Sequence, residues 1–118
     1  MHDRCDPVCL VDPLVIDKHM DRYRKGSRKL VDTARYYGVE LTEAEAHTAY
    51  GDALAAALVA RKLGEKYPAV GSMTPFQLHT AQALWYAEQA ASFEAYLRRQ
   101  GKNDTISREW PVRTAVSA

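Results

Sequence analysis

Apolar residues recur along most of the chain at the three- and four-residue spacing of an α-helix that buries one face. The first such stretch has its apolar side chains at Leu30, Val31, Ala34 and Tyr37. Ser27 is suited to cap the start of this helix, and Gly38 is suited to the left-handed conformation that commonly follows a last turn. The pattern therefore predicts a helix over residues 28–37.

A second helix is predicted for the alanine-rich stretch that ends at Lys66, because strong helix formers fill it and its large apolar residues share one side. These apolar residues are Leu54, Leu58, Val59 and Leu63. The start of the helix stays open. Thr42-Glu43-Ala44-Glu45 has the form of a capping box, so the helix begins either there or nearer Ala49. Tyr67-Pro68 ends it, and a loop is expected up to Met73.

Thr74-Pro75 begins the longest predicted helix, because a capping threonine precedes a proline at the first helical position. Apolar residues continue at helical spacing to Gly101, which gives about 25 residues by counting the pattern. The rest of the chain is polar and irregular. We therefore expect a partial domain over residues 1–100 and an irregular C-terminal tail over residues 101–118.

Residues 8–12 differ from this pattern because they are apolar and rich in β-branched side chains. They predict a short strand that ends at Pro13, since proline has no N–H for a central ladder position. A turn or a single helical turn follows to about Met20. A lone strand leaves its backbone unpaired, so its companion sheet is expected elsewhere. The predicted fold class is mainly α, with one short N-terminal strand and three helices.

Size and composition indicate an ordinary globular domain. The chain has 118 residues, of which 47% are hydrophobic and 26% are charged, and no apolar run approaches the length of a membrane span. The N-terminal residues lack the basic, apolar and small-residue order of a secretory signal. We therefore expect a cytoplasmic protein with no membrane partner.

Positive charge is concentrated in residues 18–29, although the net charge of the whole chain is only +1. The cations are Lys18, Arg22, Arg24, Lys25, Arg28 and Lys29, against the single acid Asp21. Such a cluster binds nucleic-acid phosphates in many proteins and is a solvated loop in others. We predict that these six residues contact nucleic acid.

His47 and Asp52 precede the apolar body of the second helix. Five positions on an ideal helix differ by about 140° around the axis, so the two side chains meet only if His47 lies in a bent segment before the helix. Together they suit metal-dependent phosphodiester cleavage, in which carboxylates hold divalent ions and a histidine takes a proton from the attacking water. Many helices carry the same spacing without any catalytic role, so the pair alone is weak support.

Four sequence motifs occur in a recognisable order, and the last of them contains this pair. They are Val11-Asp12-Pro13-Leu14, Arg28-Lys29-Leu30-Val31-Asp32, Tyr36-Tyr37-Gly38-Val39 and His47-x-Ala49-x-x-Asp52-Ala53. This order resembles the DEDDh-type 3′→5′ exonucleases, the proofreading family that includes the ε subunit of bacterial replicative polymerases. The likeness covers residues 10–66. Beyond them, Gln89-Ala90-Ala91-Ser92-Phe93 and Trp110-Pro111-Val112 resemble the C-terminal extension of actinobacterial and phage members.

The resemblance implies the C-terminal part of an RNase H-like α/β exonuclease fold that acts on single-stranded DNA 3′ ends. It implies that His47 is the general base and that Asp52 is the last of four acids that bind Mg²⁺ or Mn²⁺. The family's first motif, Asp-x-Glu, and its second motif have no counterpart in the 118 residues. One carboxylate cannot hold two Mg²⁺ ions, so we expect activity only with an N-terminal exonuclease half. The alternative is a non-catalytic helical module that binds nucleic acid or a polymerase subunit.

The remaining acids and aromatic residues support less specific interpretations. Asp12 and Asp17 lie near the basic stretch, but Asp12 is expected to bond local backbone rather than a metal. Tyr36 and Tyr37 are expected in the core more often than on a nucleic-acid base. Four aromatic residues of the last helix are expected to pack or to meet a partner rather than to contact bases: Trp85, Tyr86, Phe93 and Tyr96.

Overall fold

A computed structural model describes residues 9–111, and within this range the chain is helical with no β-strand. The elements in chain order are α1 (Pro13–Met20), α2 (Leu30–Tyr36), the short 3₁₀ turn η1 (Glu45–His47), α3 (Ala49–Lys66), α4 (Pro68–Gly71) and α5 (Pro75–Arg99). The mainly α fold class is confirmed. None of these helices is both long and apolar enough to cross a membrane.

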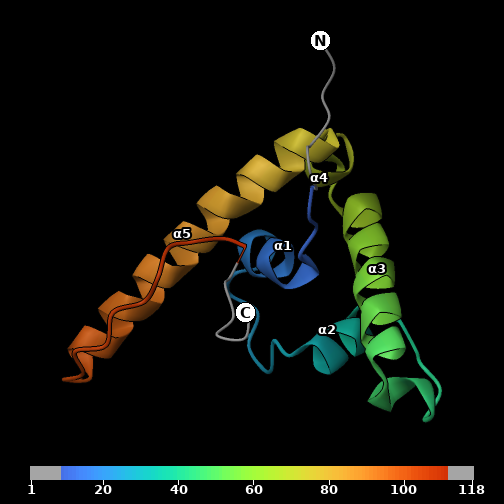
Figure 1. Ribbon diagram of the computed structural model, residues 1–118, viewed down its shortest axis with the longest axis horizontal. Helices are drawn as coiled ribbons and strands as arrows, with labels where there is room; N and C mark the ends of the chain where they lie inside the picture. The colour runs from blue at the N-terminus through green and yellow to red at the C-terminus, as the bar shows by residue number, and fades with distance from the viewer. Residues whose placement is uncertain (1–8, 112–118) are drawn as a thin grey trace, which may run out of the picture.

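The helices are arranged around α1, which lies between two diverging arms (Figure 1). The short helix α4 joins α3 to α5, and these two long helices diverge from that junction. Helix α1 packs against both, and α2 packs against α3. Residues 101–111 have no regular structure and run back along α5, where the Glu94 carboxylate accepts hydrogen bonds from the Ile106 N–H (2.9 Å) and from Arg108 (3.1 Å).

The strand predicted for residues 8–12 is wrong over 9–12, which are irregular; residue 8 lies outside the described range. The chain enters α1 instead. Asp12 is the N-cap of that helix, because its carboxylate accepts a hydrogen bond from the Leu14 N–H at 3.0 Å, and Pro13 occupies the first helical position. The expected local role of Asp12 is confirmed, and α1 is eight residues long where a turn or a single helical turn was predicted.

A glutamine from α5 supplies the backbone hydrogen bonds that a neighbouring strand would have made. The Gln82 side chain is fully buried; its oxygen accepts from the Asp12 N–H (2.6 Å) and its amide donates to the Leu10 carbonyl (2.9 Å). His79, on the same helix, is half-buried and accepts a hydrogen bond from the Leu10 N–H at 3.1 Å. The backbone groups of Leu10 and Asp12 are therefore satisfied without a sheet, and Val11 between them is exposed.

The three helices predicted from apolar spacing are present with adjusted ends. Helix α2 begins at Leu30, two residues later than predicted. Ser27 accepts a hydrogen bond from the Lys29 N–H just before the helix. Gly38, after the helix, has the expected positive φ of 77°. Helix α3 begins at Ala49, which settles its start. Helix α4 occupies the expected loop, and α5 starts with the predicted Thr74 cap and spans 25 residues.

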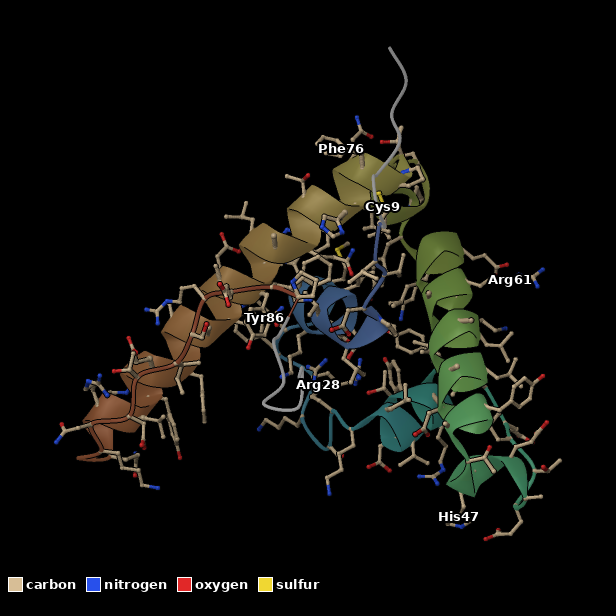
Figure 2. All side chains as sticks on the ribbon, in the orientation of Figure 1. Cys9, Arg28, His47, Arg61, Phe76 and Tyr86 are labelled. Carbon is tan, nitrogen blue, oxygen red and sulfur yellow. The ribbon has the colours of Figure 1, made fainter. Side chains whose placement is uncertain are left out.

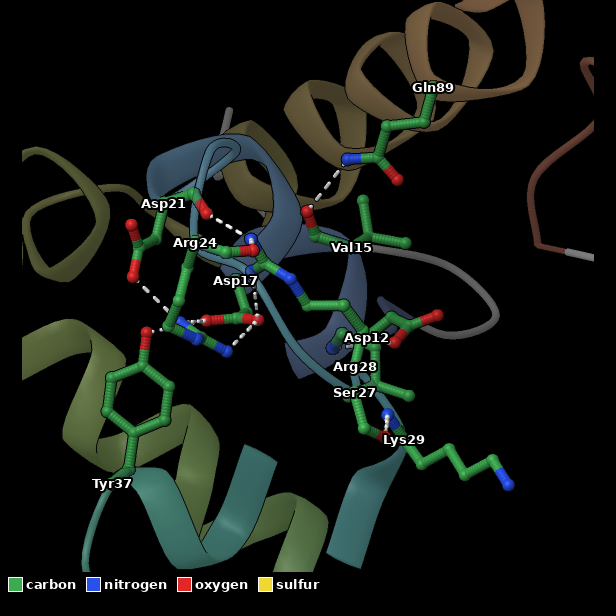
Figure 3. A network of polar contacts seen from close by, with 11 residues as sticks. Asp12, Val15, Asp17, Asp21, Arg24, Ser27, Arg28, Lys29, Tyr37 and Gln89 are labelled. Atoms are coloured by element: carbon green, nitrogen blue, oxygen red, sulfur yellow. Dashed lines mark hydrogen bonds and ion pairs between the residues drawn. The ribbon is translucent and has the colours of Figure 1, made fainter. Parts of the chain in front are cut away.

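One buried carboxylate joins three elements of the fold (Figure 3). Asp17 of α1 is fully buried, and its two oxygens accept hydrogen bonds from Arg24 at 2.8 and 2.9 Å, from Arg28 at 2.8 Å and from the Tyr37 hydroxyl at 2.6 Å. Arg28 also donates to the main-chain carbonyls of Asp21 and Arg24. The network thus fixes the 21–28 loop to α1 and to the end of α2.

Burial and hydrogen bonding act on the Asp17 pKa in opposite directions. Burial raises that pKa, but the hydrogen bonds from Arg24, Tyr37 and Arg28 outweigh it and hold the pKa of Asp17 below its ordinary value. Burial and the hydrogen bond to the Asp17 carboxylate raise the pKa of the Tyr37 hydroxyl. The network is therefore most stable with Asp17 ionised and Tyr37 neutral.

We predict that Asp17→Asn lowers the free energy of unfolding by about 3 kcal/mol, because it removes the buried negative charge that bonds both Arg24 and Arg28 and leaves only the Asp21 carboxylate, which bonds Arg24. This value is at the lower end of the usual loss for breaking a buried ion pair, because the Arg24 and Arg28 side chains keep 14% and 16% of their surface exposed. Urea denaturation followed by circular dichroism measures the loss. The matched control is Asp32→Asn, which breaks a surface pair with Arg35 and should leave the midpoint unchanged. Equal stabilities for the two variants would contradict the role given to Asp17.

We also predict an acid-sensitive stability that depends on Asp17. Its pKa is lower in the folded chain than in the unfolded chain, so the unfolded chain binds a proton first as the pH falls. The stabilisation is complete above the unfolded pKa, roughly 3.9, and is lost as the pH drops towards the lower folded pKa. Urea midpoints measured between neutral and acidic pH should fall more steeply for the wild type than for Asp17→Asn. If the urea midpoints of the two proteins fell equally with pH, the acid sensitivity would not depend on Asp17.

Candidate functional site

The bend required between His47 and Asp52 is present. Thr42 and Glu45 form a reciprocal capping box that orders η1: the Glu45 carboxylate accepts from the Thr42 N–H (3.0 Å) and the Thr42 hydroxyl accepts from the Glu45 N–H (3.1 Å). The chain is extended at Thr48, whose hydroxyl caps α3 by accepting from the Gly51 N–H at 2.9 Å. His47 therefore ends one helical segment and Asp52 lies in the first turn of the next.

Gly51 allows η1 to lie directly on the first turn of α3. A Cβ atom at this position would overlap the carbonyl oxygen of Glu45, so only glycine leaves room for the backbone contact. The contact sets the position of His47, which lies two residues after Glu45. Gly51 is thus a positioning residue that the sequence pattern alone did not single out.

The His47 imidazole is exposed and paired with an acid. Its side chain keeps 75% of its surface accessible, and Nε2 lies 3.2 Å from an oxygen of Glu43. Figure 2 places His47 at the end of the molecule where α3 begins. Glu43 was not predicted as part of the site, although its four-residue spacing from His47 is the signal of a helical pair.

Asp52 is exposed and lines a hollow of about 410 Å³ between α2 and the start of α3. Glu40 and Glu43 line the same hollow, and apolar residues of α2, including Val31, form its wall. His47 does not line it. The structure therefore places His47 and Asp52 at the same end of α3, with Glu43 touching the imidazole and facing the hollow.

The donor atoms at this end do not form a metal site by themselves. Within residues 9–111, no group of three or more His, Cys, Asp and Glu side chains is arranged to hold an ion. Two divalent cations need several oxygen ligands from more than one carboxylate. Asp52 and its neighbours therefore do not fit a two-metal centre without further ligands.

The basic stretch divides into two groups in the structure. The guanidinium groups of Arg24 and Arg28 point inward and bond Asp17, and Arg24 also lies 3.9 Å from the centre of the Tyr36 ring. The remaining four side chains are exposed: Lys18, Arg22, Lys25 and Lys29. Only this second group has its charge free to meet phosphates, while the first holds the loop in place.

The aromatic residues also fall into two groups. Tyr37 is in the core, as expected, and Trp85 is buried with its ring stacked on His19 at a centroid distance of 4.2 Å. Tyr36, Phe93 and Tyr96 are about half exposed. Packing in the core, one of the two expectations for the α5 aromatics, is thus confirmed for Trp85, whereas Phe93 and Tyr96 stay exposed. The expectation that Tyr36 lies in the core is wrong.

We predict opposite effects of alanine at two glycines of α3. Gly51→Ala should destabilise the chain and shift the NMR signals of η1 and His47, because the new methyl group displaces the Glu45 backbone. Gly64→Ala is the matched control: its Cβ would lie at an ordinary 3.6 Å from Gly71. It should stabilise the helix by roughly 0.5–1 kcal/mol. Thermal unfolding of both variants tests the pair, and a harmless Gly51→Ala would refute the close contact.

Comparison of the chain with protein-family models, with curated proteins and with solved structures found no match in any of the three. The functional assignment therefore depends on the residues and geometry of the chain itself.

Proposed function

We propose that this chain is the C-terminal portion of a metal-dependent 3′→5′ exonuclease that acts on DNA 3′ ends and needs an N-terminal half for activity. The observation that carries the proposal is the bend at Thr48, which presents His47 and Asp52 together at one end of α3. Neither side chain is sealed in apolar packing. A base and an acidic ligand for phosphodiester cleavage need this kind of access.

The hollow beside Asp52 supports an incomplete site. Its wall includes Val31, which keeps 54% of its surface exposed. Leu10 and Val11, in the segment where a strand was predicted, are exposed as well. Exposed apolar surface of this kind commonly marks a region that another protein segment covers. In the proposal, that segment brings the missing carboxylates next to Asp52.

Each residue of the pair has a defined task in the assembled enzyme. His47 removes a proton from the attacking water, with Glu43 orienting the imidazole through the 3.2 Å contact. Asp52 contributes one carboxylate to the acids that bind Mg²⁺ or Mn²⁺. The other acids belong to the N-terminal half.

A second candidate function is a non-catalytic helical module that binds nucleic acid or a polymerase subunit. The observation that favours it is the exposure of Lys18, Arg22, Lys25 and Lys29, whose charges do not depend on a completed metal site. The two functions differ in one measurable respect. The module binds but never cleaves, whatever segment is added.

We predict that the chain alone does not degrade a labelled single-stranded DNA with Mg²⁺ or Mn²⁺, and that co-expression with an exonuclease N-terminal half carrying an Asp-x-Glu motif restores 3′→5′ cleavage. In the assembled enzyme, His47→Ala should lower kcat by about 10²- to 10⁴-fold, the usual contribution of a general base. Asp52→Asn should reduce activity and raise the metal concentration required.

The matched control for Asp52→Asn is Glu65→Gln, at the opposite end of α3, which should leave kcat unchanged. Full activity of the His47→Ala enzyme would refute the catalytic assignment. DNA binding without cleavage, with every N-terminal half tested, would favour the binding module.

A further inference from the structure

A second hollow, of about 550 Å³, lies between the basic stretch and the C-terminal half of α5. The basic side contributes Lys18, Arg22, Arg24 and Arg28, and α5 contributes Trp85, Glu88, Phe93, Tyr96 and Arg99. We call it the basic–aromatic groove. The groove is lined by residues of α1, the following loop and α5, whereas His47 and Asp52 belong to η1 and α3. Figure 1 shows α1 between α5 and α3, with α2 beside the start of α3.

The groove has a net positive charge after its internal ion pairs are subtracted. Asp17 and Asp21 bond the guanidinium groups of Arg24 and Arg28, so these four charges offset one another. Lys18, Arg22 and Arg99 are exposed and face a single exposed acid, Glu88. Three cations against one carboxylate attract a polyanion.

Two exposed aromatic rings lie on the same side of the groove as Arg99. Phe93 and Tyr96 keep 51% and 49% of their surface exposed, and their rings are nearly parallel, 14° apart with centroids separated by 6.4 Å. Flat aromatic faces beside cations are the arrangement on which unpaired bases stack while phosphates meet Lys and Arg.

We propose that the basic–aromatic groove binds single-stranded nucleic acid, with bases stacked on Phe93 and Tyr96 and phosphates held by Lys18, Arg22 and Arg99. A duplex keeps its bases stacked on one another and leaves the two rings without a partner. A run of acidic side chains would use the cations but offers no aromatic face to the rings. The single strand is therefore the occupant that uses both halves of the groove.

This site deepens the proposed function, because a groove for a single strand serves an enzyme that acts on unpaired 3′ ends. It makes Phe93, Tyr96 and Arg99 of α5 part of the nucleic-acid surface. The rings and Arg99 stand outside the basic stretch that the sequence pointed to. Binding here needs neither the metal site nor an N-terminal half.

The test is fluorescence anisotropy of the full chain with a labelled oligo-dT of about 12 nucleotides, a length within the usual site sizes for single strands. EDTA is present, so that cleavage plays no part. Phe93→Ala/Tyr96→Ala should weaken binding roughly 5- to 150-fold, the loss expected for one stacked base. Lys18→Ala/Arg22→Ala should reduce the slope of log K against log salt by about 1.4, for two lost phosphate contacts.

Matched controls lie on the same helix and on the opposite arm. Phe76→Ala removes another half-exposed aromatic of α5, near its start, and Arg61→Ala removes an exposed cation of α3 (Figure 2). Both should bind like the wild type. Circular dichroism checks that each variant is folded. We expect all of them to fold, because the altered side chains are exposed.

Three results would overturn the proposal: unchanged binding by Phe93→Ala/Tyr96→Ala, equal losses in the control variants, or a duplex bound as tightly as the single strand. Displacement of the oligonucleotide by polyglutamate at equal charge concentration would also overturn it and identify an acidic protein as the occupant. Because no cleavage is measured, failure of the exonuclease assay leaves this result standing, and the reverse holds as well.

Discussion

A carboxylate buried at Asp17 has to be neutralised from within the chain, and this requirement determines the path of residues 21–28. An isolated ionised carboxylate in the interior costs far more than a small domain can tolerate. The loop after α1 therefore turns back so that Arg24 and Arg28 reach both oxygens, and Tyr37 closes the network from the end of α2. One acid thus holds α1, the loop and α2 together.

The same requirement decides which cations remain for a partner. Sequence alone placed six basic residues in one stretch, and charge counting treats them alike. Because Arg24 and Arg28 are bonded to Asp17, their charge stabilises the fold instead of extending into solvent. The loop that they anchor carries Arg22, which lines the same groove as Lys18 of α1 and residues of α5. The buried ion network is therefore the support on which the basic–aromatic groove rests.

Apolar spacing and capping residues predicted those parts of the fold that depend on interactions between residues close in sequence. Thr74 and Gly38 act as predicted, since a cap or a left-handed stop depends on neighbouring backbone. The strand at residues 8–12 failed because its backbone partners are the side chains of His79 and Gln82, about 70 positions away. At the candidate site, the pattern identified His47 and Asp52, but the contact that positions them depends on Gly51 and the Glu45 carbonyl, which no periodicity reveals.

The two candidate regions make different demands on the rest of the protein. The groove is complete within residues 9–111, because its cations and rings all come from α1, the following loop and α5. The end of α3 is incomplete, because Asp52 faces an open hollow in which the described residues assemble no metal site. In the proposed enzyme, cleavage would require a second segment that covers this hollow, whereas binding of a single strand in the groove would not. Binding could therefore precede assembly of the metal site, because the two regions have no lining residue in common.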